Sequence, residues 1–307
     1  MSVSEAVIRI NRLTKYYGKA RGIIDVDLSV EKGEIFGFLG PNGAGKSTTI
    51  RTILDYIRPT SGSAMVNGMD PTKEGANVRR SVGYLPSDFG TYKSMTCRDY
   101  LETLLNMMEH KGSNRIEELS ERFQLDLKRK IKEFSRGNRQ KVGLVSAFMH
   151  SPELVILDEP TTGLDPLMQQ EFYNLVREEK AKGNTVFLSS HILTEVEAIC
   201  DRVGIIKEGK LIVVEKMRTF KEKTGKIMQV TFENDVSSDE FRKIDGITLV
   251  ERTGKNELKI TVAKNIDEVI KALAKHSVKD LDYEDMSLES LFLKYYEKDK
   301  KGKEAEK

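Results

Sequence analysis

The sequence predicts an α/β fold over residues 1–217, followed by a small α+β domain at residues 226–296. Three observations support this division. Short apolar runs, including those at 35–39 and 154–157, have the length of buried strands, and helix-like patterns separate them. A glycine-rich segment joins the first of these runs to a helical pattern. After a polar linker at 218–225, the order becomes strand, helix, strand, strand, helix, strand, which makes this part a ferredoxin-like candidate.

The glycine-rich segment fits G-x-x-x-x-G-K-[ST], the pattern of a phosphate-binding P-loop. It consists of Gly40, Pro41, Asn42, Gly43, Ala44, Gly45, Lys46, Ser47 and Thr48. Backbone N–H groups of such a loop surround phosphate oxygens at a helix N-terminus. Lys46 would add positive charge at the β- and γ-phosphates, and the Ser47 hydroxyl would ligate Mg²⁺. The alternative, a turn that binds nothing, does not explain the matching strand and helix on its two sides. The loop alone does not distinguish a kinase, a GTPase or a motor.

The composition is typical of a water-soluble protein, with 32% charged and 38% apolar residues. The net charge of +2 is too small to indicate a nucleic-acid partner. No stretch reaches the roughly 18 apolar residues of a membrane span, and the N-terminus lacks the apolar core of a signal peptide. The two cysteines, Cys97 and Cys200, are expected to be packed thiols in a reducing cytosol.

Two strands are expected near the start of the chain, at 7–10 and 22–30. Between them Tyr17 stands directly before Gly18. The Tyr17 ring could stack on a purine, since aromatic faces accept any base, or it could pack on a sheet edge. The residues alone leave both interpretations open. Turn residues between 58 and 70 predict a hairpin.

Residues from about 90 to 150 are expected to form a helical subdomain. Thr96 and Asp99 have the spacing of a capping box, and an apolar helix face follows them. Ser135 and Gly137 stand at the start of a later helix, whose free N–H groups could bind an anion. The residues alone favour the simpler interpretation of Ser135 as an N-cap.

Two acids directly follow the apolar run at 154–157. Carboxylates at the end of a buried strand lie where open α/β sheets bind ligands. Asp158 would suit the shell of a Mg²⁺ ion, and Glu159 would suit a general base acting on water. His191 follows another apolar run, at 185–188, and this placement favours a role at the site over a structural one.

The rest of the chain predicts a hairpin at 203–214 and then the elements of the C-terminal domain. Its expected strands and helices are strands 227–232, 247–252, 257–262 and 278–283 and helices 238–244 and 266–276. A last helix is expected at 287–296. Residues 297–307 are almost all charged and are expected to be disordered.

In this order the motifs resemble those of the ATP-binding cassette (ABC) ATPases, the nucleotide-binding subunits of ABC transporters. The resemblance covers about 7–215. The segments similar to family motifs are 40–48 (Walker A), 135–140 (signature, usually L-S-G-G-Q), 154–160 (Walker B with the catalytic glutamate) and 163–166 (D-loop). His191 resembles the switch histidine, and Tyr17 matches the adenine-stacking aromatic. The resemblance implies a P-loop NTPase fold, an ABC ATPase domain with a mixed sheet core and a helical subdomain.

The sequence departs from the family pattern at several positions. Phe134, Arg136 and Asn138 replace the usual signature residues, whereas Ser135 and Gly137 are kept. Ser87 and Asp88 stand where the family has a glutamine that touches Mg²⁺, so Ser87 becomes the metal-site candidate there. The signature variants resemble those of bacterial exporter subunits, and the C-terminal block ending at 287–292 resembles the tail of drug- and peptide-export ATPases.

The resemblance also implies partners and a location. Two ATPase subunits, identical or different, would dimerise head to tail around two molecules of ATP with Mg²⁺. Ser135 and the Gly137 amide of one subunit would then contact the γ-phosphate bound by the other subunit. The His191 of the subunit that binds this ATP would contact the same γ-phosphate. The transport path would be a transmembrane permease on a separate chain, which would hold this subunit at the cytoplasmic face of the cell membrane. The main alternative is a soluble ABC ATPase without a transport role.

Overall fold

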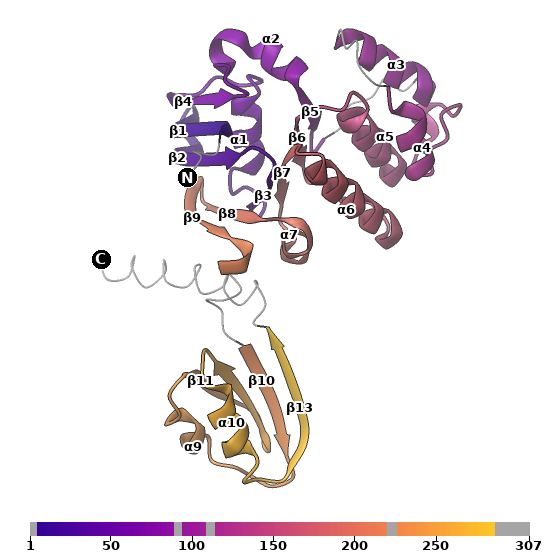
Figure 1. The fold of residues 1–307 in the computed structure, drawn as a ribbon. Helices are drawn as coiled ribbons and strands as arrows, with labels where there is room; N and C mark the ends of the chain where they lie inside the picture. The colour runs from indigo at the N-terminus through magenta and orange to yellow at the C-terminus, as the bar shows by residue number, and fades with distance from the viewer. Residues whose placement is uncertain (1–4, 89–93, 109–113, 220–225, 286–307) are drawn as a thin grey trace. The chain divides into compact units, whose positions relative to one another are not determined.

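The computed structural model describes residues 5–88, 94–108, 114–219 and 226–285. The chain divides into two compact units, Met1–Glu215 and Lys216–Lys307 (Figure 1). The division falls between residues 215 and 216, just before the polar linker that the sequence predicts at 218–225. The last predicted helix, at 287–296, and the charged tail lie outside the described residues.

The first unit is built on a six-stranded sheet whose strand order is β5-β6-β7-β3-β8-β9. The strands are β3 (Ile35–Leu39), β5 (Val82–Leu85), β6 (Leu154–Asp158), β7 (Thr185–Ser190), β8 (Arg202–Lys207) and β9 (Lys210–Lys216). Neighbouring strands from β5 to β8 are parallel. Every residue of β3, β6 and β7 is buried, as expected for parallel strands covered on both faces. The carboxyl ends of these three strands therefore meet at one edge of the sheet.

A second, antiparallel sheet has the order β2-β1-β4, with β1 (Ala6–Tyr17), β2 (Ala20–Glu31) and β4 (Ser61–Val66). Ile8 pairs with Val30 on one side and Val66 on the other, and all three side chains are buried. They share one hydrophobic core with α1 (Lys46–Ile53) and with aromatic side chains of the larger sheet. Both β1 and β2 are longer than predicted, because register shifts interrupt the alternation of buried and exposed residues.

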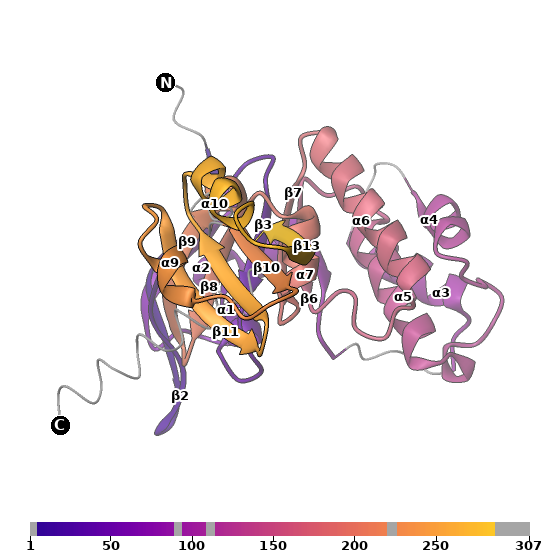
Figure 2. The same cartoon turned by 90° about the horizontal axis from the view of Figure 1, so that it is seen from below.

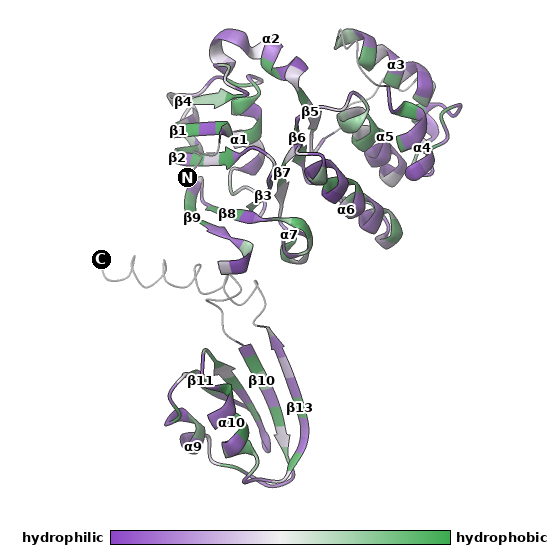
Figure 3. Ribbon diagram, in the orientation of Figure 1, coloured by the Kyte–Doolittle hydropathy of each residue, from purple (hydrophilic) through white to green (hydrophobic). Residues whose placement is uncertain are grey.

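The helical subdomain contains α3 (Cys97–Met107), α4 (Ile116–Arg122), a 3₁₀ turn (Ile131–Glu133) and α5 (Arg136–Phe148). The predicted cap of α3 is present, because the Thr96 hydroxyl accepts a hydrogen bond from the backbone N–H of Asp99. Salt bridges join this subdomain to α6 (Pro166–Ala181). Arg115 pairs with Glu179 at 2.7 Å, and Arg122 pairs with Glu178 at 2.6 Å. In Figure 3, α6 carries both hydrophobic and hydrophilic colours, since Phe172 and its neighbours are buried on one face only.

Two helices of the first unit complete its fold. α7 (Leu193–Ile199) follows β7 after a short turn. The sequence did not predict α2 (Pro71–Ser81), which is mostly polar and has a non-helical residue, Glu74, inside it.

The second unit contains β10 (Lys226–Phe232), α9 (Ser238–Arg242), β11 (Ile247–Gly254), β12 (Glu257–Val262), α10 (Ile266–Leu273) and β13 (Val278–Asp285). Its antiparallel sheet has the order β11-β12-β10-β13, with α9 and α10 on one face (Figures 1 and 2). This is the strand order of the ferredoxin-like fold. Met228, Val230 and Ile260 of the sheet share a buried core with Phe241 and Val269 of the helices.

Candidate active site

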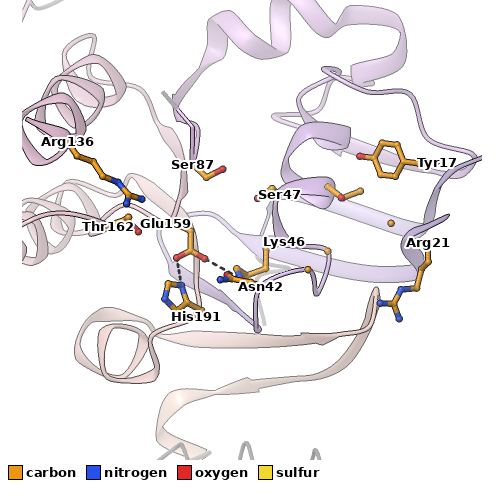
Figure 4. A pocket seen from close by; sticks show the side chains of 14 residues that line it. Tyr17, Arg21, Asn42, Lys46, Ser47, Ser87, Arg136, Glu159, Thr162 and His191 are labelled. Carbon is orange, nitrogen blue, oxygen red and sulfur yellow. Dashed lines mark hydrogen bonds and ion pairs between the residues drawn. The ribbon is translucent and has the colours of Figure 1, made fainter. Parts of the chain in front are cut away.

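A cavity of about 500 Å³ lies at the carboxyl edge of the large sheet (Figure 4). Its lining includes most of the residues that the sequence singles out: Tyr17, Asn42, Gly43, Gly45, Lys46, Ser47, Thr48, Ser87, Glu159 and His191. The remaining predicted residues, Gly40, Pro41, Ala44, Ser135, Gly137 and Asp158, are not part of the lining. The structure thus brings together segments from the N-terminal hairpin, the P-loop and the ends of β6 and β7.

The P-loop begins where β3 ends and leads directly into α1. Gly45 stands at the N-cap of α1 with φ +114°, a conformation that side chains disfavour. Lys46 is only 5% exposed, so its charge must be satisfied inside the protein. Its ammonium group donates to the carbonyl of Gly40 at 2.6 Å and to that of Pro41 at 3.3 Å. These bonds hold the lysine against the loop and explain why residues outside the cavity lining still matter to it.

Glu159 is the point where three parts of the site meet. Its Oε1 lies 3.1 Å from Lys46 Nζ, and its Oε2 lies 2.5 Å from His191 Nδ1 (Figure 4). The Glu159 backbone has φ +56°, which is uncommon for a residue with a side chain. Its N–H donates to the Ser189 carbonyl at 3.1 Å, and its carbonyl accepts from the Gln140 amide at 3.2 Å. Contacts from β7 and α5 therefore fix the residue that the sequence predicts to be the base.

Asp158 lies behind the cavity and is fully buried. Its Oδ1 accepts a hydrogen bond from the Ser189 hydroxyl at 2.5 Å. Its Oδ2 has no hydrogen-bond partner among the described residues. A buried carboxylate oxygen without a donor suits a cation or a water bound to one, because such an oxygen is costly to leave unpaired. Within the described part of the chain, no cluster of three or more His, Cys, Asp or Glu could hold a metal by itself. A metal here would therefore need further ligands from hydroxyls, water or a bound phosphate.

Ser47 and Ser87 are the hydroxyls that the sequence predicts for such a metal, and both line the cavity. Ser87 follows β5 and is exposed, whereas Ser47 lies in the first turn of α1. Figure 4 shows both side chains around the same hollow as Lys46 and Glu159.

Ser135 acts as the N-cap of α5, since its hydroxyl accepts from the backbone N–H of Asn138 at 3.2 Å. Gly137 has a packing reason to be glycine: a Cβ there would lie 2.5 Å from the carbonyl oxygen of Gly163. The signature-like segment thus packs closely on the D-loop-like segment. Neither residue lines the cavity of its own chain.

Tyr17 lies at the rim of the cavity and is 47% exposed, so its ring is not buried against the sheet. The Lys15 ammonium lies 5.5 Å from the centre of this ring. An exposed aromatic ring at the rim of the cavity is in a position where it could stack on a purine, so the stacking interpretation stays a prediction.

Sequence reasoning missed four residues of the lining, namely Arg21, Gly22, Arg136 and Thr162. Arg136 belongs to the segment in which it was noted only as a departure from the family pattern. Thr162 follows the acidic pair by three positions. Arg21 and Gly22 stand in β2 and carry no local motif that could have marked them.

Comparisons with known proteins agree with this site. A family model described as "ABC transporter" matches residues 23–162. The chain is 40% identical over 209 residues to the bacitracin transport ATP-binding protein BcrA of Bacillus licheniformis. This match covers 67% of this chain and 68% of that protein. It is 32% identical over 295 residues to the uncharacterized ABC transporter ATP-binding protein YhaQ of Bacillus subtilis, covering 94% and 97%.

A solved structure described as the ATP-binding subunit of an ABC transporter has a TM-score of 0.66 and 31% identity. The match covers 71% of this chain and 92% of that chain. No helix within the described residues is both long and apolar enough to cross a bilayer. The fold, the P-loop, the acidic pair and these relatives lead to one conclusion: the chain belongs to the ABC transporter family, as one of its ATP-binding, ATP-hydrolysing proteins.

Proposed function

We propose that this chain hydrolyses ATP to power the export of a small molecule through a transmembrane permease on a separate chain. The observation that carries the proposal is the convergence of Lys46, Glu159 and His191 in one cavity of a chain similar to a bacitracin transport protein. The permease would hold the chain at the cytoplasmic face of the membrane.

The proposed chemistry assigns a role to each side chain. Tyr17 stacks on the adenine, and the loop from Gly40 to Thr48 surrounds the phosphates with Lys46 at the β- and γ-positions. A bound Mg²⁺ would neutralise phosphate charge, with Ser47 and Ser87 as hydroxyl ligands and Asp158 behind them.

Glu159 orients the attacking water and accepts its proton, since it stands at the strand end facing the loop. In the structure Glu159 contacts Lys46. When bound phosphates pair with Lys46, this contact is lost and the Glu159 carboxylate becomes free to accept a hydrogen bond from the water. His191 lies against Glu159 and would contact the γ-phosphate. Positioning and electrostatic stabilisation supply most of the catalysis in phosphoryl transfer.

A second copy of the chain, or a different ATPase subunit, completes each site in this proposal. Ser135 and Gly137 stand at a helix N-terminus but outside the cavity of their own chain. They would donate to the γ-phosphate held by the partner, so that ATP binds between two subunits.

The alternative function is that of a soluble ABC ATPase acting without a permease. Purification of the tagged chain from detergent-solubilised membranes separates the two. The exporter proposal predicts that a multi-span protein co-purifies and raises the rate of ATP hydrolysis. A Lys46→Ala chain is the control, because it should capture the same protein without hydrolysis. Full activity in the soluble fraction, with no membrane protein attached, would support the alternative.

A further inference from the structure

A buried carboxyl group lies behind the site and has no part in the proposed chemistry. Glu195 belongs to α7, and its side chain is 1% exposed. Burial, with a smaller effect from the charge of Glu159, raises the pKa of Glu195 to about 7, although the hydroxyls of Ser190 and Thr161 act in the opposite direction. A buried ionisable group is costly, so its presence here needs an explanation in the structure around it.

A hydrogen bond connects the Glu195 side chain to the turn that carries His191. The Ser190 hydroxyl donates to Glu195 Oε2 at 2.5 Å and accepts from the backbone N–H of Ile192 at 2.9 Å. The residues on both sides of His191 are therefore tied to one hydroxyl, and that hydroxyl is tied to Glu195. His191 itself is exposed, and its Nδ1 lies 2.5 Å from Glu159 Oε2.

The same strand end also contacts the two acids and the P-loop. The Gly40 N–H donates to the Ser190 carbonyl at 3.1 Å, and the Glu159 N–H donates to the Ser189 carbonyl at 3.1 Å. Successive side chains of a strand point to opposite faces, so Ser189 reaches Asp158 while Ser190 reaches Glu195. A shift of Ser190 would therefore move His191 relative to both the P-loop and Glu159.

We infer that Glu195 is a positioning residue for catalysis: through the Ser190 hydroxyl it fixes the turn that presents His191 to Glu159 and the γ-phosphate. The inference rests on the ATP hydrolysis of the proposed function and not on the permease. It implies that Glu195 influences turnover while leaving nucleotide binding, which depends on the P-loop and Tyr17, nearly unchanged.

The test compares Glu195→Ala, Ser190→Ala and the double variant in the full chain, with kcat and the Kd for ADP measured for each. We expect each single variant to lower kcat by on the order of 10- to 100-fold, since small displacements at a site have costs of this size. The ADP Kd should stay within about twofold, a margin typical of changes that leave a binding site intact. The double variant should be no slower than the slower single variant, because both changes remove one connection. Glu195→Gln should keep most of the parental kcat, since the carbonyl oxygen of the glutamine side chain can still accept a hydrogen bond from the Ser190 hydroxyl.

Glu197→Ala is the matched control, because it removes a glutamate from the same helix. The His191 ring signals in NMR, assigned with a His191→Ala sample, should shift in Glu195→Ala and stay in place in Glu197→Ala. Parental kcat in a folded Glu195→Ala chain would overturn the inference. If Glu195→Ala does not fold, a parental kcat in Ser190→Ala would overturn the inference. It would also be overturned if the fold-loss of kcat in the double variant equalled the product of the two single fold-losses. A parent that does not exceed Lys46→Ala in hydrolysis would instead contradict the proposed function.

Discussion

Replacement of Glu159 by glutamine should have opposite effects on nucleotide binding and turnover. In the structure Glu159 Oε1 is 3.1 Å from Lys46 Nζ, the charge that is needed at the phosphates. At an effective dielectric constant of about 20, two unit charges at this separation attract by about 5 kcal/mol before solvation is considered. The side chains are 6% and 15% exposed, and most of this attraction is offset by the desolvation of the two charges.

We take the attraction that is left after desolvation to be about 1 kcal/mol. Nucleotide binding to the parent must overcome this attraction to free Lys46, so Glu159→Gln, which lacks it, should bind nucleotide roughly fivefold more tightly. ADP is the better ligand for this measurement, because its binding does not depend on contacts between two subunits at a γ-phosphate. Steady-state hydrolysis of MgATP should fall by on the order of 10²–10⁴, the usual contribution of a general base.

Calorimetric titration with ADP and a phosphate-release assay test the two effects in the same preparation. Glu153→Gln is the control, since it breaks a Lys–Glu pair of similar length, 2.9 Å to Lys32, at an exposed position. That variant should match the parent in both assays. Weaker ADP binding by Glu159→Gln would contradict the competition for Lys46, and unchanged hydrolysis would remove Glu159 from the role of base.

Tyr17→Ala should weaken MgATP binding by roughly 1–3 kcal/mol, as for other base-stacking residues, while Tyr17→Phe binds normally; parental affinity of Tyr17→Ala in calorimetry would exclude stacking. Arg115→Ala should lower the free energy of unfolding in urea by roughly 1–3 kcal/mol, because the carboxylate of Glu179, 1% exposed, loses its buried cation and keeps only the exposed Lys182 and the Asn184 amide as partners. The exposed Arg98→Ala control should leave that free energy nearly unchanged, and equal effects would contradict the importance of burial. The pKa of Glu195 rises from 4.5 to about 7 on folding, so between these pH values the unfolded chain releases a proton that the folded chain keeps. The stability of the parent should therefore fall by roughly 3 kcal/mol more than that of Glu195→Gln as the pH rises from 4.5 to above 7, and parallel unfolding curves would contradict this.

The sequence could indicate which segments meet at the cavity, because their residues stand at positions defined by the fold. The P-loop follows one buried strand, the acidic pair follows a second and His191 follows a third. Parallel strands place their carboxyl ends at one edge of the sheet, so the sequence pattern is enough to predict that these three distant segments meet. The contact between Glu159 and His191 agrees with that expectation.

Other features depend on packing that has no local pattern. The α2 helix buries only Pro71, Gly75 and Val78, so its sequence lacks an apolar face of helical period. Arg21 enters the cavity only because β1 and β2 form a long hairpin beside the P-loop. Gly137 was expected at a helix start that could bind an anion, and the resemblance gave that anion as the partner's γ-phosphate, whereas the structure adds its close approach to Gly163. Burial of Glu195 could not be expected, since a glutamate in a short helix is normally exposed.

The central claim is that each ATP is hydrolysed between two subunits, with Lys46 from one and Ser135 from the other. Mixing Lys46→Ala with Ser135→Arg tests it most directly, because Ser135 lies outside the cavity of its own chain. Each variant alone should be nearly inactive, whereas Ser135→Arg should bind ADP as the parent does. In an equimolar mixture about half of the dimers contain both variants and one intact site each, so roughly a quarter of the parental rate should return. A mixture that stays as inactive as its components would contradict the shared site, and parental hydrolysis by Ser135→Arg alone would show that one chain is sufficient.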